Sequence, residues 1–134
     1  MANTHSIFIS HSWQRHDVLE KLRSMLENRG YFNVDFSEVS REQPINSEDA
    51  YYIKRRLTER ITDSCCVLGL AGVYASYSDW MEWELAKAAA LDIPIIGIVP
   101  RGQERISTRV SRRSVIDVRW NTESIVKAIR NHYK

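Results

Sequence analysis

The chain has 134 residues, of which 43% are hydrophobic and 27% charged, and its formal net charge is +2. This length and composition are typical of one soluble globular domain with one core, which we expect to span residues 1–134. No apolar run approaches the roughly 20 residues of a membrane helix, and the N-terminus lacks a signal-peptide pattern, so neither a membrane contact nor secretion is predicted.

Apolar runs suited to buried strands alternate with helical patterns in the first half of the chain. We expect a first strand over 6–10 and, after a polar loop, a helix over 17–28 that Asp17 caps. A second strand is predicted over 33–36. The next stretch, 37–47, has no periodicity and is longer than most connections, as functional loops often are.

The second half of the chain continues the alternation. The expected elements are a helix over 48–62, a strand over 64–70, a helix over 76–90, strands over 95–99 and 115–118, and a last helix capped by Thr122. The strand over 64–70 is apolar on both faces, which predicts a central place in the sheet. Five strands alternating with helices predict an α/β fold, a three-layer sandwich in which helices cover both faces of a five-stranded parallel sheet.

The helix over 76–90 combines carboxylates with tryptophans near its start. Trp80 and Glu84 are four residues apart and share one helical face, whereas Glu82 lies roughly 200° around the helix from Glu84. We interpret Glu82 as an exposed acid that suits the helix dipole. Because this helix follows a buried strand, its first turn should lie at the carboxyl end of that strand, where open α/β sheets bind ligands.

Positive charge gathers in two places although the net charge is small. Six arginines lie between positions 101 and 119 with only Glu104 and Asp117 among them, and residues 54–56 are Lys-Arg-Arg. A solvated surface is the simplest interpretation, and a phosphate or protein contact is the alternative. Nucleic-acid binding is not predicted, because no interleaved aromatic residues or known motif accompany these arginines.

The two cysteines, Cys65 and Cys66, are adjacent within an apolar run. On a strand their side chains would point to opposite faces, so a bond between them is not expected. Without a neighbouring histidine or a further cysteine they also make a poor metal site. We therefore expect neither a disulfide nor a metal, and a location in the reducing cytoplasm.

Three stretches of the sequence resemble the TIR domain, and specifically the small bacterial TIR-like proteins of Thoeris anti-phage systems. They are IFISHS at 7–12, VDFS at 34–37 and WMEWE at 80–84. The third matches the family's W-x-x-x-E pattern, which is a weak signal alone but a strong one when the three stretches follow in this order. The resemblance covers the whole chain and implies the flavodoxin-like TIR fold.

The resemblance implies an enzyme that cleaves the bond between nicotinamide and ribose in NAD. Glu84 takes the position of the glutamate that enzymatic TIR domains need, and NAD is then a substrate, with no cofactor and no metal. The residues expected to contact NAD are Phe8, Ser10, His11, Ser12, Asp35, Ser37, Trp80 and Trp83. Those in loops also have a plainer interpretation, since serines and histidines after strands often bond only to backbone or cap the next helix.

The chemistry of this bond explains why a carboxylate is needed. Cleavage passes through an oxocarbenium-like state, because nicotinamide leaves the cationic substrate as a neutral group. A carboxylate can stabilise that state and hold a ribose hydroxyl, as in glycosidases. We assign this role to Glu84, with Trp80 and Trp83 stacking on the nicotinamide or ribose and excluding water. For Glu84 alone, a surface position on a charged helix is the alternative.

Three functions stay open at this point. The first is an NAD-consuming enzyme whose ADP-ribose-derived product activates a separate effector protein. The second is a non-catalytic TIR module that binds other proteins, and the third is a nucleoside deoxyribosyltransferase-like enzyme with Glu84 as a covalent nucleophile. The chain has no glycine-rich phosphate loop, so a neighbouring subunit of a homo-oligomer could complete the NAD site.

Overall fold

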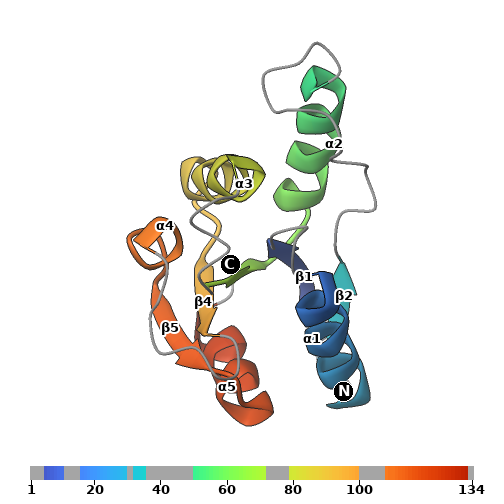
Figure 1. Cartoon of the computed structure of the whole chain (residues 1–134), viewed down its shortest axis with the longest axis vertical. Coiled ribbons are helices and arrows are strands. Elements are labelled where there is room, and N and C mark those ends of the chain that lie inside the picture. The colour runs from blue at the N-terminus through green and yellow to red at the C-terminus, as the bar shows by residue number, and fades with distance from the viewer. Residues whose placement is uncertain are drawn as a thin grey trace.

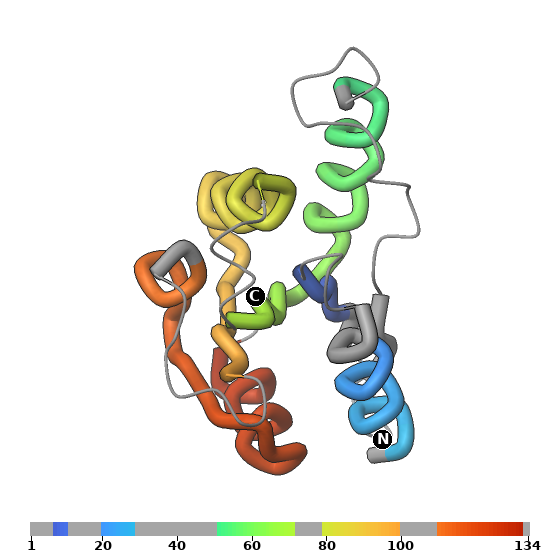
Figure 2. The backbone as a smooth tube through the Cα atoms, viewed as in Figure 1, coloured from blue at the N-terminus to red at the C-terminus, as the bar shows by residue number. Residues whose placement is uncertain are grey.

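The computed structural model shows strands and helices in strict alternation. The residues that it describes are 5–10, 16–29, 32–35, 50–71, 79–99 and 108–132. They form ten elements: β1 (His5–Ser10), α1 (His16–Arg29), β2 (Phe32–Asp35), α2 (Ala50–Thr62), β3 (Cys66–Leu70), α3 (Asp79–Ala90), β4 (Ile95–Val99), α4 (Thr108–Ser111), β5 (Ile116–Arg119) and α5 (Thr122–His132). Figure 2 traces the path of the chain through these elements. Their alternation confirms the predicted α/β class.

A single sheet contains every strand in the described part of the chain, in the order β2-β1-β3-β4-β5, and each neighbouring pair is parallel. This is the doubly wound order of flavodoxin-like folds. β3 lies in the middle, and all of its residues are buried. The prediction that the strand with two apolar faces is central is therefore confirmed.

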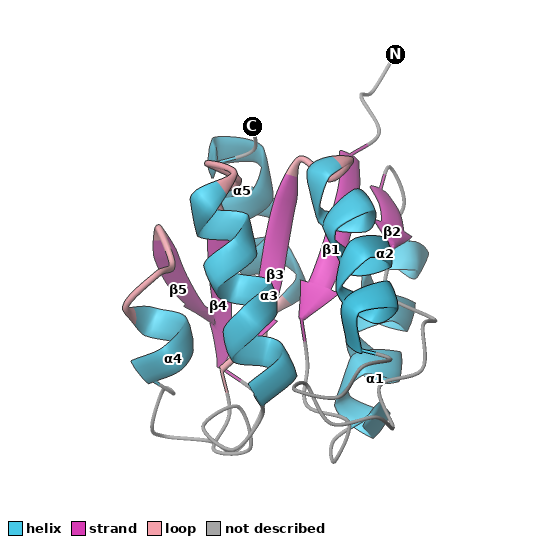
Figure 3. Ribbon diagram, turned by 90° about the horizontal axis from the view of Figure 1, so that it is seen from above, coloured by secondary structure: helices cyan, strands magenta, loops and turns pink. Residues whose placement is uncertain are grey.

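Helices cover both faces of the sheet, as Figure 3 shows. On one face α2, α3 and α4 pack their apolar residues against Phe8, Val67 and Ile95. On the other face α1 and α5 pack against Ile7 and Leu68. The sandwich thus has two separate cores, and Figure 1 shows α2 and α3 beside each other over the first of them.

One row across the sheet carries almost no side-chain bulk. Ser10 pairs with Gly69, Gly69 with Gly97, and Gly97 with Asp117. A Cβ atom at Gly69 would lie 3.1 Å from Val110 Cγ1, and one at Gly97 would collide with Asp117 Oδ1. The two glycines therefore allow α4 and the Asp117 side chain to approach the sheet closely.

α3 ends in a left-handed cap made by an aspartate. Asp92 has a φ of 58°. Its amide donates to the Ala89 carbonyl at 3.1 Å, and the Ile93 amide donates to the Ala88 carbonyl at 2.9 Å, which are the two bonds of a Schellman motif. Ile93 and Ala88 are both buried in the core beneath α3, so the cap leads the chain directly into β4.

Two predicted helix caps are wrong. α1 begins at His16, so Asp17 lies inside its first turn. At α5 the Asn121 side chain accepts a hydrogen bond from the Ser124 amide at 2.9 Å, which makes Asn121 the N-cap and Thr122 the first helical residue. Asn and Thr both cap helices well, so a sequence pattern cannot choose between adjacent ones.

The predicted separation of the two cysteines is also wrong. β3 begins at Cys66, and Cys65 lies in the bend before it, so strand alternation does not apply. Both side chains pack against the core on the α1 and α5 face, and neither cysteine is part of a disulfide. A hydrogen bond with Cys65, together with burial, raises the pKa of the Cys66 thiol. A protonated, buried thiol fits a packing role.

Candidate active site

α3 is the helix predicted to carry the catalytic residue, and it lies over the end of β1. Its first turn carries Asp79 and Glu82, whose negative charges suit the positive end of the helix dipole. The helix then crosses the glycine row, where Leu85 packs against Gly69. Since Gly69 is the register partner of Ser10, residues on this part of α3 lie close to the carboxyl end of β1.

A buried hydrogen bond joins α3 to β1. The Ser10 hydroxyl donates to Glu84 Oε1 at 2.7 Å, and both residues are 0% exposed. Ile7 and Ile9 point to the opposite face of the sheet, so strand alternation aims Ser10 toward α3. The length is that of a charge-assisted hydrogen bond to a carboxylate.

Burial of the Glu84 carboxylate is energetically costly and therefore informative. Among the residues that the structure describes, Glu84 is the one carboxylate in the buried class. Withdrawing an ionised carboxylate from water costs several kcal/mol unless hydrogen bonds or charges compensate. Its neighbours toward the sheet, Leu85 and Ala88, show that this part of the helix packs well with apolar side chains. A carboxylate kept here is a candidate functional group.

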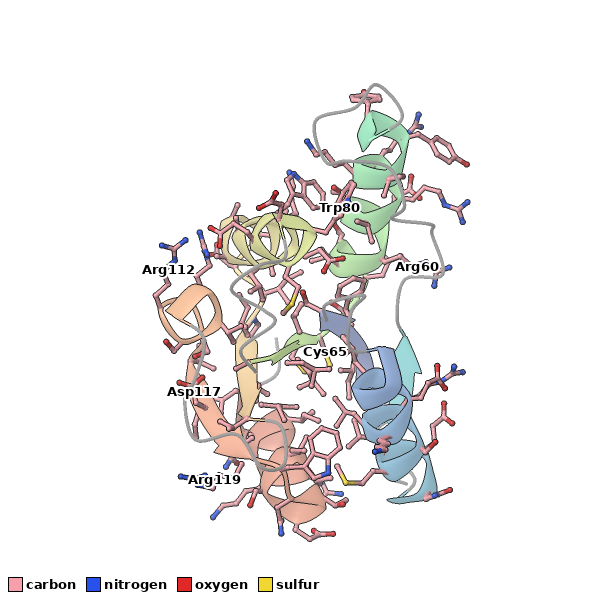
Figure 4. All side chains as sticks on the ribbon, in the orientation of Figure 1. Arg60, Cys65, Trp80, Arg112, Asp117 and Arg119 are labelled. Carbon is pink, nitrogen blue, oxygen red and sulfur yellow. The ribbon has the colours of Figure 1, made fainter. Side chains whose placement is uncertain are left out.

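The two tryptophans expected to contact NAD are on the same helix as this carboxylate and have partners in the protein. Trp80 is 8% exposed and belongs to the core with Ile53 and Leu57 of α2, and Figure 4 shows it between α2 and α3. Trp83 is half-buried. Its ring centroid lies 6.3 Å from that of Trp80 in an edge-to-face arrangement, and the Lys87 ammonium lies 5.5 Å from it. The Trp80 ring thus packs between α2 and α3, whereas Trp83 contacts Trp80 and Lys87 of its own helix.

Glu82 is not the exposed acid that the sequence suggested. Its Oε1 accepts hydrogen bonds from Arg112 Nη2 at 2.6 Å and from Arg113 Nη2 at 2.8 Å. The Glu82 side chain is 30% exposed, against 57% for Arg112 and 21% for Arg113. The hydrogen bond from Arg113 lowers the pKa of the Glu82 carboxyl, although burial acts in the opposite direction. Two arginines of the basic segment are thus ion-paired with α3, and only Arg113 is largely buried.

Among the other residues expected to contact NAD, the structure describes the side chain of Phe8 alone. The Phe8 side chain is 0% exposed and lies in the core beneath α2 and α3, where it packs. Asp35 ends β2 and is the register partner of Phe8, but its side chain lies outside the described residues. His11, Ser12 and Ser37 also lie outside them. The structure therefore brings together Ser10 and Glu84, with the two tryptophans on the same helix.

The described residues contain neither a cluster suited to a metal ion nor a membrane-spanning helix. Within them, no three His, Cys, Asp or Glu side chains are arranged to hold a metal ion. Over the same part of the chain, no helix has the length and apolar character needed to cross a membrane.

The segment that contains this site matches a known family. A family model for the TIR-like domain of Thoeris protein ThsB matches residues 8–105, well over half of the chain. The chain belongs to the ThsB TIR-like family. The matched segment includes both Ser10 and Glu84 and ends before α4. No curated protein matches the chain.

Solved structures share the fold at low sequence identity. A 2-deoxyribosyltransferase from Bacillus psychrosaccharolyticus is 17% identical with a TM-score of 0.66, over 90% of this chain and 89% of that one. The CMP N-glycosidase BcmB from Clostridium botulinum is 15% identical with a TM-score of 0.59, over 93% and 98%. The flavoenzyme FerB from Paracoccus denitrificans is 14% identical with a TM-score of 0.58, over 99% and 100%. At these identities the likeness shows the fold alone.

Sequence reasoning missed that Ser10 and Glu84 are partners, because it placed Ser10 among the residues that contact NAD. One signal could have found the pair. Ser10 directly follows three apolar residues on a strand expected to be buried, so its hydroxyl needs a partner inside the protein. Glu84 was already expected at the same edge of the sheet. No comparable local signal points from Glu82 to Arg112 and Arg113.

Proposed function

We propose that the chain is an enzyme that cleaves the bond between nicotinamide and ribose in NAD and releases an ADP-ribose-derived nucleotide. The observation that carries the proposal is the buried Glu84 carboxylate, bonded at 2.7 Å to the Ser10 hydroxyl at the end of β1. Membership of the ThsB TIR-like family supports a role in anti-phage defence. The nucleotide product would then act on a separate effector protein.

Glu84 supplies the charge that the reaction needs. The bond between the ribose anomeric carbon and the nicotinamide nitrogen breaks, and its electron pair leaves with the nicotinamide. The ionised carboxylate stabilises the positive charge that develops on the ribose and accepts a hydrogen bond from a ribose hydroxyl. Water, or another nucleophile such as the adenine ring, then adds to the anomeric carbon. Ser10 fixes the direction of the carboxylate by its bond to Oε1.

The burial of Glu84 implies an activation step. Its exposed fraction is 0%, so NAD reaches the carboxylate only after a rearrangement that opens a path from the carboxyl edge of the sheet. Two events could cause that rearrangement: assembly into a homo-oligomer, or binding of a factor made during phage infection. We therefore expect the isolated chain to be slow.

A nucleoside N-glycosidase or transferase is the second candidate. Two structures with the same fold over nearly their whole length are a 2-deoxyribosyltransferase and a CMP N-glycosidase. In such chemistry Glu84 would attack the anomeric carbon of a nucleoside, the base would leave, and the resulting glycosyl ester would pass the sugar to water or a second base. A trapped adduct on Glu84 distinguishes this route from the first.

Nicotinamide release from NAD tests the proposal. The wild-type chain is assayed at high concentration, with and without extract of phage-infected cells, beside Glu84→Gln. Glu27→Gln is the matched control, because Glu27 is an exposed glutamate on α1. We expect the wild type and the control to be at least about 10³-fold faster than Glu84→Gln, with mass spectrometry identifying the nucleotide product. A wild type no faster than Glu84→Gln in either condition rejects NAD cleavage, and base exchange on deoxynucleosides or cleavage of CMP establishes the second candidate.

A further inference from the structure

The first turns of α3 are held from two nearly opposite sides. Glu84 and Glu82 are two residues apart, which is roughly 200° around the helix axis. Glu84 is bonded to Ser10 of β1, whereas Glu82 is bonded to Arg112 and Arg113, which follow α4. Any rotation of α3 about its axis stretches both sets of bonds.

The support for the two arginines is itself tied to the sheet. Val110 of α4 is 0% exposed and lies over Gly69 and Gly97. The Arg113 amide donates to the Val110 carbonyl at 3.1 Å, and the Val115 amide donates to the Ile95 carbonyl of β4 at 2.8 Å. The turn that carries the arginines is therefore anchored before and after them, and its guanidinium groups are not on a free loop.

Small rotations of α3 would matter at the carboxylate. A side-chain tip lies about 5–6 Å from the axis of a helix, so a rotation of about 10° moves it by roughly 1 Å. A displacement of that size at a reacting group can reduce a rate by about 10²-fold. The bond between Ser10 and Glu84, at 2.7 Å, would be lost over the same movement.

We propose that Arg113, acting through Glu82, is a positioning residue for Glu84 that fixes the rotation of α3 on the sheet. The proposal rests on the proposed function of Glu84. Arg113 has the larger role, because its side chain is 21% exposed while that of Arg112 is 57% exposed and more fully hydrated. Both arginines lie beyond the residues that match the family model, which end at 105, so the family match does not account for them.

The test measures steady-state NAD cleavage in Arg113→Ala, Arg113→Lys, Glu82→Gln and the double variant Glu82→Gln/Arg113→Ala. Arg23→Ala is the matched control, since it removes an ion pair of the same 2.8 Å length on the other face of the sheet. Arg113→Ala should lower kcat by about 10-fold and change KM by less than about twofold. Arg113→Lys should recover most of the loss, and the double variant should be no slower than the slower single one, because the two residues act as one pair.

Each other outcome counts against the proposal. A kcat for Arg113→Ala equal to that of Arg23→Ala overturns it. A double variant whose fold-loss in kcat equals the product of the losses in Glu82→Gln and Arg113→Ala also overturns it. If the wild type cleaves no NAD, the proposed function fails, and hydrogen exchange still tests the positioning. Amides of residues 81–85 should then exchange at least about threefold faster in Arg113→Ala than in Arg23→Ala, and equal exchange rejects the restraint on α3.

Discussion

Glu82 and Glu84 lie on the same helix with one residue between them, yet they differ in burial and in partner. Glu84 is 0% exposed and accepts a hydrogen bond from the uncharged Ser10 hydroxyl. The Glu82 side chain is 30% exposed and meets two arginine side chains. The two arginines neutralise the charge of Glu82, so this ion pair is a structural contact. Glu84 faces the edge of the sheet where ligands bind in this class of fold, with a neutral partner that orients it.

The difference shows how one residue type acquires two roles from its surroundings. A carboxylate paired with two cations has little further charge to offer a substrate, and the pairing favours its ionised form at all but acid pH. A buried carboxylate with a hydroxyl partner carries a desolvation cost that folding alone does not require. Substitutions at each glutamate and at its partner can therefore separate the two roles.

The first prediction separates catalytic from structural need at Glu84. Glu84→Gln should abolish NAD cleavage, by about 10³-fold or more, because the transition-state charge loses its counterpart. Glutamine keeps the length of the side chain and an oxygen that can accept the Ser10 hydroxyl bond, so the free energy of unfolding should not fall. Urea unfolding beside the nicotinamide assay measures both. A variant that loses stability along with activity would instead mark Glu84 as a structural residue.

The second prediction concerns the partner of Glu84. Ser10→Ala should lower the free energy of unfolding by about 1–3 kcal/mol, because a buried carboxylate loses a hydrogen bond that water does not replace. Introducing Glu84→Gln into this variant should restore part of the loss. Ser114→Ala is a suitable control, since the Ser114 hydroxyl bonds to the exposed Asp117 at 2.6 Å and its removal should cost less than about 1 kcal/mol. Equal losses in the two serine variants would contradict the prediction.

The third prediction concerns the pH dependence of the Glu82 pair. The pKa of Glu82 is lowered in the folded protein, so the pair stabilises fully above the usual glutamate value of about 4.3, and this contribution disappears as pH falls through the lowered pKa. Wild type should exceed Glu82→Gln in stability by about 0.5–1 kcal/mol at pH 7, since the partners are partly exposed. The difference should vanish on acidification and shrink in high salt, as measured by urea unfolding. A difference that grows in acid would reverse the assigned sign.

The smallest expected effect lies at the far end of α3. Asp92 adopts a φ of 58°, a conformation that costs most L-residues energy and suits glycine. Asp92→Gly should therefore stabilise the fold by about 0.5 kcal/mol, whereas Asp92→Ala should not. Thermal unfolding detects the difference, and NAD cleavage should be unchanged because the cap lies away from Glu84. Slower cleavage in Asp92→Gly would show that this cap also sets the rotation of α3.

Local patterns were enough to predict much of the fold. The order of the elements other than α4 follows from apolar runs and periodicity within their own residues. Helix geometry also placed Trp80 and Glu84 on neighbouring turns of one face. The bounds of the elements and their caps were less certain, as Asn121 and Cys65 illustrate, because one or two residues change the outcome while the pattern hardly changes.

Contacts between distant residues could not be predicted in the same way. Glu82 meets Arg112 and Arg113, which are 30 and 31 residues away, and no local feature of either segment selects the other. The partner of Glu84 was within reach, because Ser10 directly follows the apolar run 7–9 of a strand expected to be buried. Phe8 shows the opposite limit. Its place in the NAD-contacting stretch was expected from resemblance, whereas its ring packs in the core.

The bond between Ser10 and Glu84 joins residues that are 74 positions apart in the chain. During synthesis Ser10 leaves the ribosome well before α3 is made, and β1 can pair with β3 only when β3 has followed it. Contacts of such long range form late in folding, after the intervening chain has been ordered. A chain that ends before α3 therefore has no arrangement in which Ser10 orients Glu84, and the proposed activity on NAD can begin only after translation has passed α3.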